Sequence, residues 1–124
     1  GAAYIFTRSG TTWSQEAKLL ASDAVSSDKF GCSISINADG NAVIIGALQA
    51  DISGDTRAGA AYVFQKSNSS WSQEKKLTAS NSGANDQFGT QVSMSKDGAY
   101  AVSGAPFEDT TAANSGMIYI YKAG

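Results

Sequence analysis

The residues best placed to do chemistry in this sequence are acidic and lie in two corresponding stretches. Asp51 and Asp55 follow one apolar run, and Phe107, Glu108 and Asp109 follow a similar run later in the chain. Two carboxyl groups can hydrolyse a glycoside only when they are held at a defined separation. Glu108 and Asp109 are adjacent in a loop, so we expect no catalysis from them. We expect these five residues to line one rim, either as solvated loop charges or as contacts for a ligand such as a sugar.

Other catalytic groups are missing from the sequence. There is no histidine, which excludes the usual nucleophile–histidine pairs and histidine metal sites. Glycine loops with a phosphate-binding pattern are also absent. Cys32 is the single cysteine, and its even spacing from Ile34 and Ile36 predicts a small buried hydrophobic side chain rather than a reactive thiol. We therefore expect a protein that is not an enzyme and that needs no cofactor.

Charge and hydropathy exclude two classes of partner. The net charge is −2 over 124 residues, and the nine basic residues are scattered singly apart from Lys75-Lys76. A surface that follows phosphates needs clustered cations, so we expect no nucleic-acid binding. No apolar run approaches the roughly 20 residues of a membrane-spanning helix, so we expect no membrane insertion. The chain begins at Gly1 without methionine or a signal peptide, which indicates a processed or excised piece.

An internal repeat is the strongest pattern in the sequence. "GAAYIF" returns as "GAAYVF", "WSQEAKL" as "WSQEKKL", and "DKFG" as "DQFG", all shifted by 58 residues. A third copy begins at Gly116 with "GMIYIYK", one residue early. We therefore expect one repeat domain over residues 1–124, with a partial unit at 1–22, a full unit at 23–80 and a partial unit at 81–124.

Each full unit is predicted to form four antiparallel strands. "CSISI" and "TQVSM" alternate apolar and polar residues, and "AVIIGA" and "YAVSGA" are nearly continuous apolar runs. Asp39-Gly40 and Asp97-Gly98 lie between these runs as hairpin turns. "AAYIFTR" and "AAYVFQK" give a third strand. The sequence thus predicts an all-β fold of four-stranded units.

The fourth segment, which begins at Trp13 or Trp71, has two interpretations. Thr12 with Gln15 forms a capping box, which favours a helix. A helical stripe through Trp13 and Ala17 is lost in the second copy, where lysine replaces the alanine. A strand keeps the tryptophan and leucine on one face in both copies, so we favour an edge strand.

Four antiparallel strands per repeat indicate a β-propeller blade, whose two faces pack against neighbouring blades. The repeat resembles the FG-GAP repeat, of the short-loop extracellular type more than the integrin α-subunit type. The residues that carry the resemblance are Phe30, Gly31, Gly46 and Ala47 in one copy, and Phe88, Gly89, Gly104, Ala105 and Pro106 in the next. We expect them to be structural, with each phenylalanine filling the gap between two blades.

The resemblance raises the question of calcium, because the integrin type carries a D-x-[DN]-x-D-G cation loop. The matching loops here keep one carboxylate each, Asp39 and Asp97, and Lys96 lies beside the second. Calcium prefers six to eight oxygen ligands. We therefore predict two tight turns and no metal site.

The strand pattern also predicts a core and an assembly. The residues expected to be buried are Phe30, Ile34, Ile36, Val43, Ile44, Tyr62, Phe64, Phe88, Val92 and Val102. The third strand of the unit occurs three times and the other strands twice, so identical chains cannot close a ring with every strand used once. We expect either further blades of a longer array or pairing between copies of the chain.

Two functions remain open from the sequence. The first is a non-enzymatic module at the cell surface or outside the cell, which acts as a scaffold or in adhesion and protein interaction. The second is a glycan-binding propeller module that uses the rim residues. The resemblance implies the first, and the acidic, aromatic rim residues suggest the second.

Overall fold

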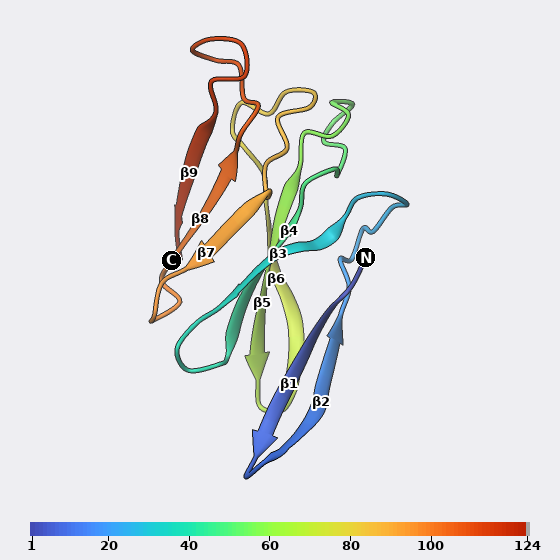
Figure 1. The fold of residues 1–124 in the computed structure, drawn as a ribbon, viewed down its shortest axis with the longest axis vertical. Coiled ribbons are helices and arrows are strands. Elements are labelled where there is room, and N and C mark those ends of the chain that lie inside the picture. Colours follow the sequence, from blue (N-terminus) through green and yellow to red (C-terminus); the bar gives the residue numbers. More distant parts are fainter. Residues whose placement is uncertain (124) are drawn as a thin grey trace.

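The computed structural model describes residues 1–123, which form nine strands and no helix (Figure 1). The strands are β1 (Ala3–Ser9), β2 (Thr12–Leu19), β3 (Phe30–Ile36), β4 (Ala42–Ala47), β5 (Ala60–Ser67), β6 (Ser70–Leu77), β7 (Gln91–Met94), β8 (Tyr100–Ala105) and β9 (Met117–Lys122). No membrane-spanning helix is found among these residues.

The strands form three separate antiparallel sheets, which confirm the predicted all-β, blade-like fold. The first sheet is β1-β2, the second is β3-β4-β5-β6, and the third is β7-β8-β9. The ambiguous fourth segments are strands, because β2 pairs with β1 and β6 pairs with β5. Both Asp-Gly turns close with a backbone hydrogen bond, from Gly40 N to Asn37 O (3.1 Å) and from Gly98 N to Ser95 O (2.9 Å).

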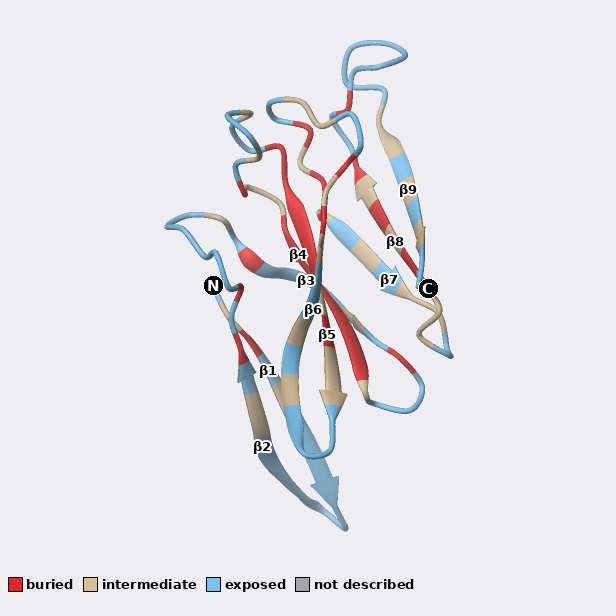
Figure 2. Ribbon diagram, turned by 180° about the vertical axis from the view of Figure 1, so that it is seen from behind, coloured by how far each residue is buried: buried red, intermediate tan, exposed pale blue. Residues whose placement is uncertain are grey.

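The core consists of two clusters, each shared by two successive sheets. Phe30 lies in the cluster between the first and second sheets, with its ring edge-on to Tyr62 at 5.5 Å between centroids. Phe88 lies in the cluster between the second and third sheets, edge-on to Tyr119 at 5.4 Å. Figure 2 shows the buried residues concentrated in β4 and β5, at the centre of the molecule. The predicted burial of both phenylalanines is confirmed, as is that of Val43, Ile44, Tyr62 and Phe64.

Glycines allow the second and third sheets to approach closely. A Cβ added at Gly46 on β4 would lie 2.0 Å from Gly89 O and 2.4 Å from Ser33 Oγ. Gly89 has a φ of 90°, a conformation that side chains disfavour. Ser33 Oγ donates to Gly89 O at 2.7 Å, so a polar contact links the two sheets where a side chain would keep them apart.

The prediction that Ile34, Ile36 and Cys32 are buried is wrong. Ile34 and Ile36 are 58% and 50% exposed, and Cys32 is exposed as well. Cys32 lies at a register irregularity of β3, where its Sγ donates to Gly89 O at 3.4 Å beside the third sheet. Ile34 and Ile36 do share one face of β3, as their even spacing indicated. The adjacent first sheet has only two strands, however, and it does not cover this face.

The corresponding residues of the third sheet show what such a face contacts when a complete blade lies beside it. Val92 and Met94 on β7 occupy the positions of Ile34 and Ile36, and they pack against the cluster shared with the second sheet. Val92 and Val102 are nevertheless only partly buried, so their predicted full burial is also wrong.

The other end of the molecule also exposes large apolar side chains. Ile118 and Ile120 on β9 are 72% and 70% exposed. Their counterparts on β5, Ala61 and Val63, pack in the cluster between the second and third sheets. The two exposed pairs are named the β3 face (Ile34 and Ile36) and the β9 face (Ile118 and Ile120).

Candidate functional site

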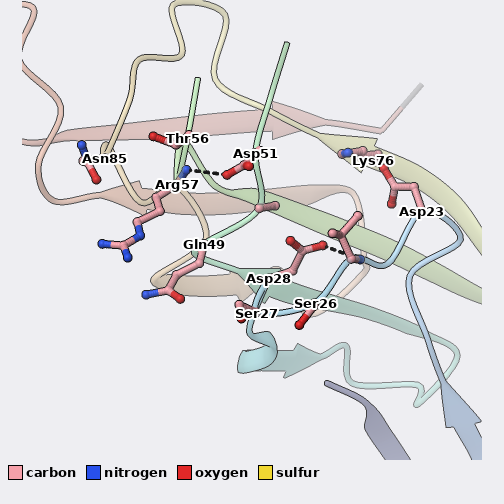
Figure 3. Close-up of a pocket in the computed structure, with 12 residues that line it drawn as sticks. Asp23, Ser26, Ser27, Asp28, Gln49, Asp51, Thr56, Arg57, Lys76 and Asn85 are labelled. Carbon is pink, nitrogen blue, oxygen red and sulfur yellow. Dashed lines mark hydrogen bonds and ion pairs between the residues drawn. The ribbon is translucent and has the colours of Figure 1, made fainter. Parts of the chain in front are cut away.

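The loops that follow β4, β6 and β8 extend toward the same end of the molecule (Figure 1). A cavity of about 780 Å³ lies among the first two of these loops and the β2–β3 loop (Figure 3). Its lining residues are Asp23, Val25, Ser26, Ser27, Asp28, Gln49, Ala50, Asp51, Thr56, Arg57, Lys76 and Asn85. The cavity is therefore polar and carries charges of both signs.

Two carboxylates of this cavity are used to hold their own loops. Asp51 Oδ1 accepts a hydrogen bond from Arg57 N at 2.9 Å, and Asp28 Oδ2 accepts one from Val25 N at 2.9 Å (Figure 3). Short polar side chains commonly close turns in this way. Asp28 and Asp51 thus shape the cavity before they could contact any ligand.

A buried tyrosine links this cavity to the second sheet. Tyr62 OH donates to Asp23 Oδ1 at 2.9 Å, and Lys76 Nζ lies 2.5 Å from Asp23 Oδ2. The hydrogen bonds from Lys76 and then Tyr62 hold the pKa of Asp23 below its ordinary value. Burial, followed by the hydrogen bond to Asp23 and the charge of Asp23, raises the pKa of Tyr62, which therefore stays protonated as a donor. This arrangement stabilises a loop and has no poised acid or base.

The third sheet has a related arrangement with different chemistry. Tyr119 OH donates to Asn81 Oδ1 at 2.5 Å, and Asn81 Nδ2 donates to Glu108 Oε1 at 2.8 Å. Asn81 occupies the position of Asp23, and Glu108 occupies that of Ala50. Thr110 N also donates to Glu108 Oε1, at 3.0 Å. The second oxygen of Glu108, Oε2, is buried and has no hydrogen-bond partner among the described residues.

The structure divides the predicted rim residues between two loops. Asp51 is exposed in the β4–β5 loop, and Asp55 pairs its backbone with Ile52 in the same loop. Phe107 and Asp109 are exposed in the β8–β9 loop, where Asp109 Oδ1 accepts from Asn114 N at 2.6 Å. Of these residues, only Asp51 lines the cavity.

Glu108 is the exception, because it is 2% exposed and does not lie on the rim surface. The expectation that Glu108 is a solvated loop charge is therefore wrong, and its contact with a ligand stays a prediction. Its carboxylate is held inside by Asn81 and Thr110, as the loop folds over it. In the other copy, the corresponding position holds Ala50, which is buried. Comparing the two copies could have identified this position as internal.

Asp86 is a second buried carboxyl group that the sequence reasoning missed. It is 4% exposed, and its Oδ2 accepts from Gly83 N at 2.7 Å. Burial raises the pKa of Asp86, and the nearby charge of Glu108 adds to the effect. Asp86 and Asp28 precede the Phe-Gly pairs at equivalent positions, and both cap the backbone three residues earlier. The recurrence of an aspartate at both positions could have identified them from the sequence, and it indicates a structural role.

The carboxylate of the second Asp-Gly turn also accepts hydrogen bonds from its own turn. Asp97 Oδ1 accepts from Ala99 N at 3.0 Å and from Ser95 Oγ at 2.8 Å, which lowers the pKa of Asp97. No group of three acidic, cysteine or histidine residues that could hold a metal is found within residues 1–123. What the described residues offer is polar loop chemistry and exposed apolar side chains, among them those of the β3 face and the β9 face.

Comparison with known families agrees with this arrangement. A family model described as the FG-GAP repeat matches residues 13–64 and 71–121, and so covers more than half of the chain. Each matched stretch runs from the last strand of one sheet into the first three strands of the next. A search of curated proteins found no match.

Proposed function

Because the chain belongs to the FG-GAP repeat family, we propose that it is a non-enzymatic scaffold or protein-interaction segment of an extracellular or cell-surface protein. FG-GAP repeats are generally β-propeller modules for protein interaction or adhesion, and they are typical of extracellular proteins. The family is typically non-enzymatic. The proposal goes further in assigning the interaction to the two exposed faces of this chain.

The exposed apolar side chains carry the proposal. Within the chain, the counterparts of the β3 face and the β9 face meet in one cluster between the second and third sheets. The chain therefore leaves side chains from both halves of a blade–blade interface exposed to solvent. Exposed apolar patches of this kind mark interaction sites more often than isolated apolar residues do. Further blades, or other copies of this chain, have the matching surface.

Light scattering over a range of protein concentrations tests the proposal. We expect the mass to rise with concentration, because association buries the two apolar faces. Replacing Ile118 and Ile120 with lysine should weaken this association. A matched control is Leu20→Thr, because Leu20 is 52% exposed and the second copy carries Thr78 at that position. A compact monomer at all concentrations would contradict the proposal.

Glycan binding is a second candidate, favoured by the polar cavity beside Asp51 and Arg57. Sugars are usually bound by polar groups together with an aromatic face, and no aromatic residue lines this cavity. Phe107, the aromatic residue of the predicted rim, is not among the lining residues either. Binding to several related sugars on a glycan array, lost in Asp51→Ala, would favour this candidate over the scaffold.

A further inference from the structure

The polar cavity among the loops has walls that are joined to one another by backbone hydrogen bonds. Gln49 N donates to Asp28 O at 3.1 Å, which ties the β4–β5 loop to the β2–β3 loop. Asn85 N donates to Thr56 O at 2.8 Å, which ties the β6–β7 loop to the same β4–β5 loop. Each of these loops joins two strands, so the cavity is formed inside the chain. Its volume of about 780 Å³ lies in the range of small-molecule sites, which are usually largely formed before a ligand binds.

The two copies of the repeat differ at the floor of this cavity. Ala50 lines the cavity, and Glu108 takes its position in the next copy. The longer side chain is buried there, and its Oε1 accepts from Asn81 Nδ2 at 2.8 Å and from Thr110 N at 3.0 Å. Asn81 itself takes the position of Asp23, another lining residue. The second sheet therefore leaves open a space that the third sheet fills with its own side chain.

One side of the cavity is rich in hydrogen-bond donors. Figure 3 shows the guanidinium of Arg57 pointing away from Asp51, toward the side where the amides of Gln49 and Asn85 lie. Both ion pairs found within residues 1–123 use lysines, so the charge of Arg57 has no counter-ion among them. A planar guanidinium donates two parallel hydrogen bonds to a carboxylate, and each amide can donate a further N–H. These three side chains together match the carboxylate group of a ligand.

The rest of the cavity offers acceptors and hydroxyl groups. Asp28 and Asp51 each use one carboxylate oxygen to accept a backbone N–H, which leaves the other oxygen for a ligand. Three hydroxyl side chains and two apolar ones lie among the lining residues, so the cavity does not suit an apolar acid. A ligand with several hydroxyl groups can donate to the two carboxylates. Those carboxylates repel a second negative charge, which confines the carboxylate of the ligand to the side of Arg57.

We propose that the cavity binds a sugar acid of the uronate type, whose carboxylate pairs with Arg57 and whose hydroxyl groups donate to Asp28 and Asp51. Such a ligand is held by an ion pair and hydrogen bonds, so it does not need the aromatic face that the lining residues do not provide. The inference rests on the glycan-binding candidate and narrows that candidate to one class of sugar.

A nuclear magnetic resonance titration of the full, isotope-labelled chain tests the inference, with D-glucuronate as the probe. D-glucose is the matched sugar, because it keeps the ring hydroxyl groups and has a hydroxymethyl group in place of the carboxylate. Acetate has the carboxylate without the hydroxyl groups. We expect D-glucuronate to shift the amide resonances of residues 23–28 and 49–57. We expect D-glucose and acetate each to bind at least about tenfold more weakly, since each loses one set of hydrogen bonds.

Three variants of the chain locate the binding. Arg57→Gln removes the guanidinium and keeps the backbone N–H that Asp51 accepts, so the affinity for D-glucuronate should fall about tenfold. The matched control is Arg8→Gln on β1, which removes the same charge from a guanidinium that lies over Trp13, and the affinity should stay within about twofold. Ala50→Glu gives the second sheet the residue of the third and should prevent binding. If Ala50→Glu does not fold, the two arginine variants still decide.

Several results would overturn the inference, and they differ in what else they reject. No binding of D-glucuronate would reject the glycan-binding candidate as well. Equal affinity for D-glucose would keep that candidate and reject the acidic class. Equal affinity for acetate, equal losses in the two arginine variants, or shifts confined to other segments would mean that the cavity is not a sugar-acid site. Association through the β3 face and the β9 face is measured separately by light scattering, so the scaffold proposal does not depend on this result.

Discussion

Replacing Gly46 with alanine should be far more damaging than the same replacement at Gly104. The two glycines occupy equivalent positions on β4 and β8, and neither has a positive φ. They differ in what lies against them. A Cβ at Gly46 would lie 2.0 Å from Gly89 O, whereas a Cβ at Gly104 has nothing within 4 Å. Gly89, which precedes the third sheet, packs on Gly46, whereas no sheet within residues 1–123 packs on Gly104.

The size of the effect follows from these distances. Ordinary contact begins at 3.4 Å, so Gly89 O would have to move by about 1.4 Å. Overpacking of this kind typically costs about 1–3 kcal/mol. The movement also breaks the hydrogen bond from Ser33 Oγ, which is worth about 1 kcal/mol. The total of about 2–4 kcal/mol corresponds to a fall in Tm of roughly 8–16 °C for a domain of this size.

Thermal unfolding followed by circular dichroism measures both variants against the unmodified chain. We expect Gly104→Ala to leave Tm unchanged or to raise it slightly, because alanine reduces the freedom of the unfolded chain. Equal Tm values for the two variants would refute the argument, since they would mean that the second and third sheets are not in close backbone contact in solution.

Three further outcomes are expected. Phe88→Ala should lower the free energy of unfolding by about 3–5 kcal/mol in urea denaturation, because its ring is fully buried between two sheets. The control is Phe107→Ala, at an exposed site. An unchanged urea midpoint for Phe88→Ala would contradict the blade interpretation. Millimolar calcium should leave Tm unchanged, because each Asp-Gly turn offers one carboxylate, and a marked rise that a chelator reverses would contradict this. Asp23→Asn should cost up to about 1 kcal/mol at neutral pH, as a surface ion pair does. Because the pKa of Asp23 is lowered on folding, its contribution is present above the ordinary aspartate pKa and is lost as the pH falls through the lower folded value. The Asp23→Asn deficit measured at neutral pH should therefore disappear in strongly acidic solution, and a deficit that persists there would contradict the ion-pair explanation.

The repeat made much of the fold predictable from the sequence. Comparing two copies decided between helix and strand for the segments at Trp13 and Trp71, because the helical stripe was lost in one copy and the strand face was kept. Both segments are strands, β2 and β6. Alternation also identified which side chains share a face of β3. Such local information does not depend on what lies next to the strand.

Burial could not be predicted in the same way, because it depends on neighbours. Ile34 and Ile36 have the alternation of core residues, yet the adjacent first sheet leaves them exposed. The prediction for Glu108 failed in the opposite direction. A charged loop residue is normally solvated, so Glu108 was expected to be exposed, and it is buried. Its burial follows from hydrogen bonds to Asn81 and Thr110, which a single charge in the sequence does not reveal.

Hydrogen–deuterium exchange at low and high protein concentration tests most directly whether the β3 face and the β9 face are docking surfaces. We predict that peptides covering Phe30–Ile36 and Met117–Lys122 exchange more slowly at high concentration, while the exposed turn between β1 and β2 does not change. Protection confined to other segments, or no change anywhere while light scattering shows association, would contradict the account.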